Sequence, residues 1–321
     1  MKILITGGSG YIGSITVSEL LKAGHTVSVF DRSQNPRFSN TPGLDFVKGD
    51  LLNSQSIASV LKEVKPDAVV HFAAYIEMGE SVREPRKYYE NNVLGSYHLA
   101  NAMVDAGVDK IVFSSSAGVY GNPESVPIPE DSCCRPENPY GETKLTVERM
   151  LRWYEKPYGL RSICTRYFNA AGATLDGKAG ENHQPESHLI PTIIKAQLQG
   201  KEFTLFGDDY HTPDGTCVRD YIHVLDLASA HLKALEALEA GAKSNYYNVG
   251  TGVGYSNREI IKMVEKISGK PVKMSVVPRR PGDADELVAD VTKIKQELGW
   301  SPKYSDLETI IKTAYAWHNQ Q

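Results

Sequence analysis

The amino-acid sequence predicts an α/β fold: a Rossmann-type, doubly wound parallel sheet, followed by a smaller, mainly C-terminal α/β lobe. Three observations lead to this prediction. In the first half, short apolar runs alternate with amphipathic stretches, as in parallel strands joined by crossover helices. A glycine-rich turn connects the first such run to the first helical stretch. From about Gly172, the chain changes to loops rich in Gly, Pro, Asn and Asp, with separate helical stretches between them.

The first strand, turn and helix form the most diagnostic segment of the N-terminal half. The apolar run at 3–5 leads directly into TGGSGYIG at 6–13, and apolar residues then recur at helical spacing. Such glycines let the backbone approach a pyrophosphate, whose charge is stabilised at the helix N-terminus. The spacing Gly7, Gly10, Gly13 departs from the standard G-x-G-x-x-G. The segment nevertheless predicts a dinucleotide-binding turn.

The second strand indicates which dinucleotide this turn binds. It spans 26–30 and ends at Asp31. An acidic side chain here accepts hydrogen bonds from the adenosine ribose and repels a 2′-phosphate, so Asp31 favours NAD over NADP. Arg32 follows directly, and an arginine at this turn could instead host the extra phosphate. The cofactor expected is NAD.

The remaining elements follow the same alternation of patterns. Further strands are predicted at 67–72, 110–114 and 161–166, with helices near 54–64, 86–106 and 140–156. Later helices are predicted at 188–199, 225–239, 256–268 and 305–318. We therefore expect an NAD-binding domain at 1–171, to which roughly 214–245 return, and a mainly substrate-binding lobe at 172–321.

Composition excludes several classes of partner. The net charge is −4 and the charged residues are mixed, so neither nucleic acid nor an anionic membrane surface is expected. No apolar stretch approaches the ~18 residues that a membrane span requires. The N-terminus leads straight into the first strand, so we expect no signal peptide.

Cysteine and histidine patterns give no sign of a metal. The cysteines match no metal-ligand spacing, and we interpret them as the reduced thiols of a cytoplasmic enzyme: Cys133, Cys134, Cys164 and Cys217. Three histidines suggest no ligand cluster: His183, His211 and His223. No metal is therefore expected.

Tyr140 and Lys144 form a candidate catalytic pair in the segment NPYGETK at 138–144. Four residues make about one helical turn, so the two side chains leave the same face of a helix. A free phenol titrates near pH ~10 and is a poor base at neutral pH. A fixed cation nearby favours the phenolate, so the pair fits a general base.

With these segments in place, the chain resembles the extended short-chain dehydrogenases/reductases, and closely the nucleotide-sugar 4-epimerases typified by the UDP-glucose (UDP-galactose) 4-epimerases. The resemblance covers nearly all 321 residues. Besides the segments quoted above, it is carried by GDL at 49–51, HFAA at 71–74, GES at 79–81, YYENNV at 88–93, SSS at 114–116, VYG at 119–121, RYFNAAGA at 166–173, HLIP at 188–191, FGDDY at 206–210, DGTCVRDYIHV at 214–224 and PRRPGD at 278–283.

The resemblance implies which residues contact NAD. Asp50 and Leu51 are expected beside the adenine, residues 72–74 along the central groups, and Phe168 at the nicotinamide. Asn91 is expected to touch the cofactor or to support the lysine. The full expected set is Gly7, Gly10, Tyr11, Ile12, Gly13, Asp31, Asp50, Leu51, Phe72, Ala73, Ala74, Asn91, Ser114, Tyr140, Lys144 and Phe168.

The resemblance also implies a catalytic set and a UDP-sugar site. The catalytic residues expected are Tyr140, Lys144 and Ser116, which ends a strand where its hydroxyl can bond both the tyrosine and the sugar. Two arginines and an aromatic ring suit a nucleoside diphosphate. The substrate-binding residues expected are Ser116, Tyr140, Asn169, His188, Phe206, Arg219, Arg280, Asp283 and Leu287.

The activity implied is an isomerase reaction of carbohydrate metabolism, the NAD-dependent 4-epimerisation of a UDP-hexose (UDP-glucose/UDP-galactose) through a transient 4-keto sugar. Alternatives are 4-epimerisation of a UDP-N-acetylhexosamine, UDP-pentose or UDP-uronate, and a non-catalytic NAD-binding sensor. A 4,6-dehydratase is disfavoured, because Ala117 and Gly118 follow Ser116 where those enzymes carry an Asp–Glu pair.

Two further expectations come from the same family. Its members commonly form homodimers by packing the helices near 86–106 and 140–156 against those of a second copy. The residue four after the aspartate of the PRRPGD-like segment lines the hexose pocket, and a bulky tyrosine there tends to exclude an N-acetyl group. In this chain the position is Leu287, which is intermediate in volume.

Overall fold

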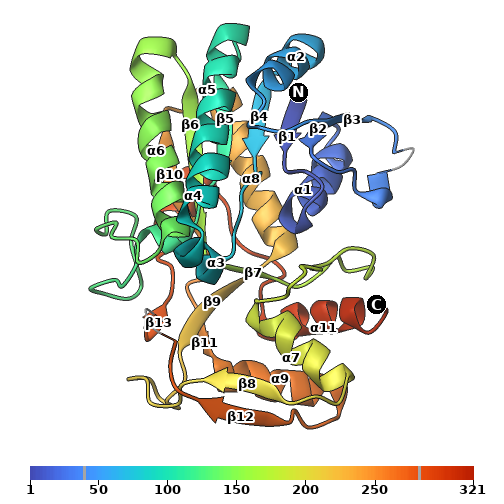
Figure 1. Cartoon of the computed structure of the whole chain (residues 1–321), viewed down its shortest axis with the longest axis vertical. Helices are drawn as coiled ribbons and strands as arrows, with labels where there is room; N and C mark the ends of the chain where they lie inside the picture. Colours follow the sequence, from blue (N-terminus) through green and yellow to red (C-terminus); the bar gives the residue numbers. More distant parts are fainter. Residues whose placement is uncertain (39–40, 281–282) are drawn as a thin grey trace. The chain divides into compact units, whose positions relative to one another are not determined.

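The computed structural model describes residues 1–38, 41–280 and 283–321. It divides into two compact units, which are described separately (Figure 1). The first comprises Met1–Gly121, Cys133–Arg166 and Ala228–Tyr247, and the second comprises Asn122–Ser132, Tyr167–Leu227 and Asn248–Gln321. Pro281 and Gly282, in the PRRPGD segment, lie outside the described residues.

Most of a seven-stranded sheet lies in the first unit, in the order β10-β6-β5-β4-β1-β2-β3 (Figure 1). Its strands are β1 (Lys2–Thr6), β2 (Thr26–Asp31), β3 (Leu44–Lys48), β4 (Ala68–His71), β5 (Lys110–Ser114), β6 (Arg161–Tyr167) and β10 (Asn245–Val249). From β3 to β6 every neighbouring pair is parallel. The order reverses between β1 and β4, where open parallel sheets bind ligands at their carboxyl ends. The predicted doubly wound α/β fold is confirmed.

Helices connect these strands and end at recognisable caps. They are α1 (Tyr11–Lys22), α2 (Ser54–Val64), α3 (Met78–Arg83), α4 (Pro85–Tyr88), the π-helix η2 (Tyr89–Leu94), α5 (Gly95–Ala106), α6 (Pro139–Tyr158) and α8 (Val224–Glu239), with 3-10 turns η1 (Pro36–Phe38) and η3 (Ala117–Val119). Asn138 caps α6 by accepting a hydrogen bond from the Gly141 amide at 2.9 Å. Gly107 and Gly159 end α5 and α6 in the left-handed conformation.

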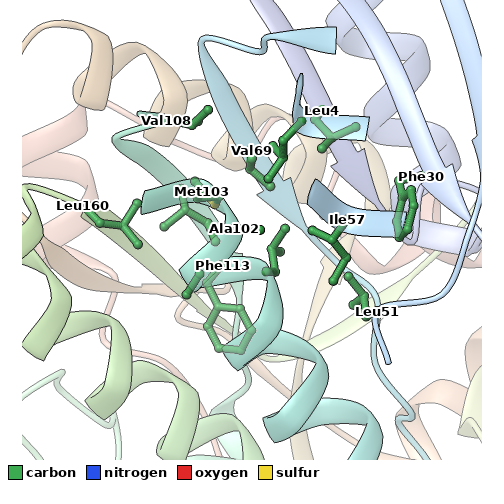
Figure 2. Close-up of a cluster of buried hydrophobic side chains, with 14 of the residues drawn as sticks. Leu4, Phe30, Leu51, Ile57, Val69, Ala102, Met103, Val108, Phe113 and Leu160 are labelled. Atoms are coloured by element: carbon green, nitrogen blue, oxygen red, sulfur yellow. The ribbon is translucent and has the colours of Figure 1, made fainter. Parts of the chain in front are cut away.

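Apolar side chains of α2, α5 and α6 pack against one face of the sheet. Figure 2 shows those of α2 and α5 beside side chains of the strands. From the strands come Leu4, Val69 and Phe113, whose positions alternate with residues of the opposite face. From the helices come Ile57 and Met103, both fully buried. Burying such a side chain contributes roughly 1.5–3 kcal/mol, so this layer holds the carboxyl ends of the strands at fixed positions.

The second unit contains smaller sheets and its own apolar core. Its strands are β7 (Asn169–Ala171), β8 (Phe203–Phe206), β9 (Val218–His223), β11 (Gly254–Ser256), β12 (Met274–Val277) and β13 (Glu286–Leu287), and its helices are α7 (Leu189–Leu198), α9 (Asn257–Ser268), α10 (Thr292–Leu298) and α11 (Leu307–His318). Strand β9 pairs with β7, β11 and β13, while β8 pairs with β12. Residues of α7, α9 and α11 form the core, including Ile193, Ile260 and Ile310.

Two features depart from the elements expected. The helix predicted near 86–106 is interrupted by the π-helix η2, which holds Asn91 and Asn92, both poor helix formers. Strands β3 and β10, helix α10 and the strands of the second unit were not among the predicted elements. Among the described residues, no helix combines the length and the apolar character that crossing a bilayer requires.

Candidate active site

The glycine-rich turn after β1 has geometry that only glycine permits. Gly7 has a φ of +73°, and a Cβ there would lie 2.5 Å from the Ala73 amide nitrogen. A Cβ on Gly13 would lie 2.3 Å from the Gly7 carbonyl oxygen. Gly10 is the N-cap of α1, with no side-chain cap among the described residues. The opening amides of α1, including that of Ile12, are therefore arranged to receive a pyrophosphate.

The ends of β2 and of the next strand place polar groups beside this turn. Asp31 Oδ2 accepts a hydrogen bond of 3.0 Å from the backbone of the glycine-rich turn. Arg32 Nε lies 3.0 Å from Asp50 Oδ2, and its Nη1 donates to the Tyr75 hydroxyl at 2.8 Å. Arg32 Nη2 also donates to Asn91 Oδ1. The guanidinium thus contacts three side chains of this unit. Of these, Asp50 was expected beside the adenine, and Asn91 was expected to touch the cofactor or to support the lysine.

The segment after β4 lies against the end of β1. The amides of Phe72 and Ala73 both donate to the Thr6 carbonyl, at 2.9 and 3.1 Å, and Ala74 follows them. Leu51 is buried in the core, and its carbonyl oxygen lies 3.0 Å from Nδ1 of a helix α5 histidine. The cofactor residues expected after β1, β2 and β4 therefore meet at one edge of the sheet, where the strand order reverses.

Asn92 in the π-helix links two parts of this edge. Its Oδ1 accepts from the Tyr75 amide at 2.8 Å and from Asn91 Nδ2 at 2.9 Å. Its Nδ2 donates to Thr143 Oγ1 at 3.2 Å, and that hydroxyl donates to the Tyr140 carbonyl at 2.7 Å. Asn92 therefore positions the first turn of α6 rather than facing solvent.

Lys144 is buried one turn after Tyr140. Its Nζ donates to the Ser114 carbonyl at 2.6 Å and lies 5.9 Å from the centroid of the Tyr140 ring. Burial lowers the pKa of Lys144 to about 7, although the charge of Glu148 opposes the shift. Tyr140 is also buried. The pair expected from the sequence thus lies on one helical face, with the ammonium held at the end of β5.

Ser116 is the N-cap of η3, which packs against α6. Ser116 Oγ accepts from the Gly118 amide at 3.0 Å. A Cβ on Gly141 would lie only 2.4 Å from the Gly118 carbonyl oxygen, and one on Gly118 would lie 3.9 Å from Tyr140 Cε1. Two facing glycines therefore allow the serine turn and the tyrosine turn to approach. The structure brings Ser116, Tyr140 and Lys144 into one region.

A buried ion pair beneath this region was not found from the sequence. Arg166 Nη2 lies 2.7 Å from Glu148 Oε2, and Ser115 Oγ donates to Glu148 Oε1 at 2.5 Å. Arg166 Nη1 also donates to the Tyr120 hydroxyl at 3.0 Å. Burial opposes the charge of Arg166, but the hydrogen bond and charge of Glu148 prevail and raise its pKa. The available signal was the position of Glu148, one helical turn after Lys144 on α6.

His71 is a second buried group that sequence reasoning missed. Its Nδ1 lies 2.6 Å from Thr6 Oγ1 and its Nε2 lies 2.8 Å from Ser96 Oγ. Burial, and then the charge of Lys144, lower the pKa of His71 to about 3. The ring is therefore neutral at physiological pH and serves as a hydrogen-bonding link between β1 and α5.

The second unit brings together two of the expected substrate residues. Asn169 on β7 and His188 at the N-cap of α7 line a cavity of about 40 Å³, together with Tyr221. Asn169 Nδ2 donates to the Asp220 carbonyl at 3.1 Å. Phe168 precedes this strand and is buried, with its amide bonded to the Val249 carbonyl at 3.1 Å.

The other expected substrate residues gather around β9, β8 and the segment before β13. Arg219 on β9 is in register with Leu287 on β13. The Arg280 guanidinium lies 5.1 Å from the centroid of the Phe206 ring, and its Nε lies 3.0 Å from Asp283 Oδ2. An arginine stacked on an aromatic ring and a second arginine on the adjoining sheet form a surface suited to a nucleotide diphosphate.

The buried carboxylate of Asp220 organises this sheet and was also missed. It accepts hydrogen bonds from the Thr251 amide and hydroxyl at 2.9 and 2.7 Å, and from the amides of Gly252 and Ala289 at 3.0 and 3.2 Å. Burial raises the pKa of Asp220. These bonds connect β9 to the turn after β10 and to the chain that follows Leu287.

A group of histidines and glutamates also converges in the second unit, where no ligand cluster was expected. Each member offers one potential ligand atom, and these atoms all lie within 4.8 Å of one another: Glu181, His183, Glu186 and His188. Burial disfavours the charge on His188, but hydrogen bonds to Glu181 and Glu186 prevail and raise its pKa to about 10. Sequence reasoning missed the group because its carboxylates and histidines follow no regular ligand spacing.

Comparison with known proteins agrees with this architecture. The model of the NAD dependent epimerase/dehydratase family matches residues 3–250. The UDP-glucose 4-epimerase of Lactobacillus helveticus is 48% identical over 320 residues, covering 99% of this chain and 97% of the relative.

Two solved structures are similar over essentially the whole chain. The UDP-glucose 4-epimerase of Brucella ovis in complex with NAD superposes with a TM-score of 0.94 at 44% identity, covering 98% of this chain and 97% of that one. The enzyme of Bifidobacterium longum in complex with NAD⁺ and UDP gives a TM-score of 0.92 at 37% identity, covering 100% and 99%.

A doubly wound sheet with a glycine-rich turn at its switch point, and a buried Tyr–Lys pair nearby, defines the class of nicotinamide-nucleotide enzymes. Within that class, the chain belongs to the NAD dependent epimerase/dehydratase family. The family description makes NAD the cofactor. The turn of Gly7 to Gly13, Asp31 at the end of β2 and the open N-terminus of α1 fit that dinucleotide.

Proposed function

We propose that this protein is an isomerase that interconverts UDP-glucose and UDP-galactose by NAD-dependent 4-epimerisation through a transient 4-keto sugar. Relatives named UDP-glucose 4-epimerase match it over nearly its full length at up to 48% identity. The observation that carries the chemistry is the buried Lys144 ammonium on the Tyr140 face of α6, with Ser116 on the adjoining turn.

In this proposal Tyr140 removes the proton of the sugar's 4-hydroxyl and returns it after the sugar has turned over. Lys144 stabilises the phenolate, and Ser116 orients the 4-hydroxyl by a hydrogen bond. NAD, when bound, supplies the site that accepts the hydride from carbon 4 and gives it back to the opposite face. The Ser114 carbonyl holds the Lys144 ammonium, so the cation stays in place through both half-reactions.

The substrate is proposed to be anchored by its UDP portion. Arg219 and Arg280 would neutralise the diphosphate and Phe206 would stack on the uracil, with Asn169, His188 and Asp283 as polar contacts. Leu287 would line the hexose pocket. Anchoring at the nucleotide leaves the 4-keto sugar free to present either face. In this proposal, NAD is bound mainly by residues 1–171 and the UDP-sugar mainly by residues 172–321.

Two broader features belong to the same proposal. A homodimer would form through α5 and α6, where Trp153 is 79% and Tyr97 is 47% exposed. A cytoplasmic location rests on the cysteines, since Cys133, Cys134, Cys164 and Cys217 form no disulfide.

The test of the activity is the Tyr140→Phe variant. We expect turnover of UDP-galactose to fall by about 100- to 10,000-fold, because the general base is lost, while NAD remains bound. Turnover is followed by a coupled assay for UDP-glucose, and bound NAD by absorbance after gel filtration. Tyr158→Phe, which removes an exposed hydroxyl from the same helix, is the matched control. Turnover near the wild-type rate in Tyr140→Phe would exclude this mechanism.

A further inference from the structure

The segment between β7 and α7 brings four potential metal ligands close together. Glu181 Oε1 lies 2.7 Å from His188 Nδ1 and 3.0 Å from His183 Nδ1. Glu186 Oε1 lies 3.3 Å from the same His188 nitrogen. The four ligand atoms all lie within 4.8 Å of one another.

The surroundings favour a cation at this point. The Glu181 and Glu186 side chains are only 5% and 9% exposed, so two carboxylates are held away from water. Lys195 Nζ on α7 lies 3.1 Å from Glu186 Oε2 and offsets one of these charges. Trp317 Nε1 on α11 donates to the Glu181 carbonyl at 2.8 Å and fixes its backbone.

A further buried group lies close by. His318 on α11 has an Nδ1 with no hydrogen-bond partner in the described part of the chain. It is within electrostatic reach of Glu181 and Glu186. A buried nitrogen without a partner indicates that the region is not fully satisfied by protein groups alone.

We propose that Glu181, His183, Glu186 and His188 form a binding site for a divalent metal ion of the zinc type. Two imidazole nitrogens and two carboxylate oxygens are ligands that Zn²⁺ takes in tetrahedral geometry. With metal–ligand bonds of about 2.0–2.2 Å, tetrahedral ligand atoms lie about 3.3–3.6 Å apart. Three of the ligand separations, at 2.7–3.3 Å, are equal to or slightly shorter than this, so those pairs would move apart by less than about 1 Å. All the ligand atoms lie within 4.8 Å of one another, so the remaining pairs would close by less than about 2 Å.

The metal's role is structural. It links Glu181, whose carbonyl is hydrogen-bonded to Trp317 on α11, to His188, the N-cap of α7. The metal would thereby fix the conformation of the segment between these two residues. Of the four residues, only His188 is also proposed to contact the substrate, whereas Glu181, His183 and Glu186 have no part in the proposed epimerisation. Because metal content is measured directly on the protein, the inference stands or falls independently of the proposed activity.

The experiment is a zinc-binding measurement on the full chain. Protein treated with a chelator and then freed of it is titrated with Zn²⁺ against a chromophoric competitor, and its zinc content is measured after gel filtration. Wild type is expected to bind one Zn²⁺ per chain. His183→Ala and Glu181→Gln are expected to lose affinity by more than the roughly 10- to 100-fold that changes outside the ligand set cause.

Two controls make the result specific. His211→Ala removes a histidine of the second unit that is 91% exposed and pairs with a single carboxylate, Asp285, at 3.1 Å, so it should bind zinc as wild type does. Cys133→Ser removes an exposed thiol and should also leave the stoichiometry at one. Circular dichroism confirms that each variant is folded.

Two results would overturn the proposal. One is wild-type protein that holds no stoichiometric zinc. The other is folded His183→Ala that binds Zn²⁺ as tightly as wild type. Either result would mean that the cluster is an ion-pair network built around a protonated His188. If Glu181→Gln fails to fold, His183→Ala decides alone, because its half-exposed side chain can be removed without opening the core.

Discussion

At the scale of single residues, Lys144 in the candidate active site changes its charge near neutral pH. Burial brings its pKa to about 7, and the charge of Glu148 on the next helical turn resists that shift. A lysine whose pKa is lowered in the folded state destabilises the fold while it is charged. The free energy of unfolding therefore rises, as far as Lys144 is concerned, between pH 7 and the usual pKa of a lysine.

Replacing Lys144 tests its electrostatic role. In Lys144→Met, Tyr140 loses the cation that favours its phenolate, so its pKa should rise. We expect kcat/KM to fall and the acidic limb of the pH–rate profile to move to higher pH, with partial recovery in alkaline buffer. Lys156→Met, near the end of the same helix, serves as the control. If the rate falls but the acidic limb of the pH–rate profile stays where it is, Lys144 contributes only to ligand binding and not to the pKa of Tyr140.

Leu287 is the residue expected to decide between sugars. It lies on β13 in register with Arg219, and it is intermediate in volume. We expect efficient action on UDP-glucose and UDP-galactose, with weaker action on UDP-N-acetylglucosamine, because a few methyl-sized groups are worth only about 1–3 kcal/mol. The measurement compares kcat/KM for both substrates in wild type, Leu287→Tyr and Leu287→Ser. If kcat/KM for UDP-N-acetylglucosamine is the same in the two variants, residues other than Leu287 determine which sugar is accepted.

At the scale of elements, α6 carries three functional groups on one face. Tyr140, Lys144 and Glu148 follow one another at intervals of one turn, and Glu148 reaches across to Arg166 on β6. Ser115, between the expected residues Ser114 and Ser116, is bonded to the same carboxylate. The ion pair therefore holds α6 to the ends of β5 and β6.

Removing the carboxylate of this pair should destabilise the fold. In Glu148→Gln the buried guanidinium of Arg166 keeps its charge without a counter-ion, so the free energy of unfolding should fall by about 3–5 kcal/mol. Urea unfolding followed by circular dichroism measures it. Glu63→Gln, which neutralises an exposed glutamate on α2, should change stability by less than ~0.5 kcal/mol. A loss in Glu148→Gln as small as in that control would mean that water already screens Arg166.

At the scale of the whole molecule, the proposed dimer depends on the outer surface of α5 and α6. These helices contact each other, and Tyr154 on α6 donates to Asn101 on α5 at 3.0 Å. Large apolar side chains remain exposed on both, with Trp153 at 79%. An exposed apolar surface of this kind is what a two-fold interface would bury.

A charge placed on that surface should separate the copies. We expect wild type to sediment as a dimer at micromolar concentration, whereas Trp153→Glu should sediment as a monomer, because a carboxylate would be buried in an apolar interface. Arg152→Glu, which also adds a negative charge to an exposed position of α6, tests whether charge alone is responsible. A wild-type monomer would rule out this interface.

Local patterns were sufficient to predict β1, β2, β4, β5 and β6 of the seven-stranded sheet, and helix α6, but not β3 or β10. The β-branched run of β1, the glycine-rich turn and the helical spacing after it each depend on neighbours in sequence. The range predicted for β5, 110–114, agrees with the structure, as does the range 54–64 predicted for α2. In contrast, β8 and β13 are short, and they became visible only through pairing with distant strands.

The sequence by itself therefore determined the fold class, the family and the candidate chemistry, because glycine geometry, hydrophobic period and one-turn spacing are local properties. Only the tertiary structure decided which distant groups meet. Glu148 on α6 forms an ion pair with Arg166 on β6. Asp220 accepts hydrogen bonds from the amides of Gly252 and Ala289, which lie in separate segments. Glu181 lies 2.7 Å from His188, although an irregular loop separates them in sequence. The physical reason is that hydrogen bonds and ion pairs are stronger where burial lowers the dielectric constant. Burial is a property of the folded chain and not of any single segment.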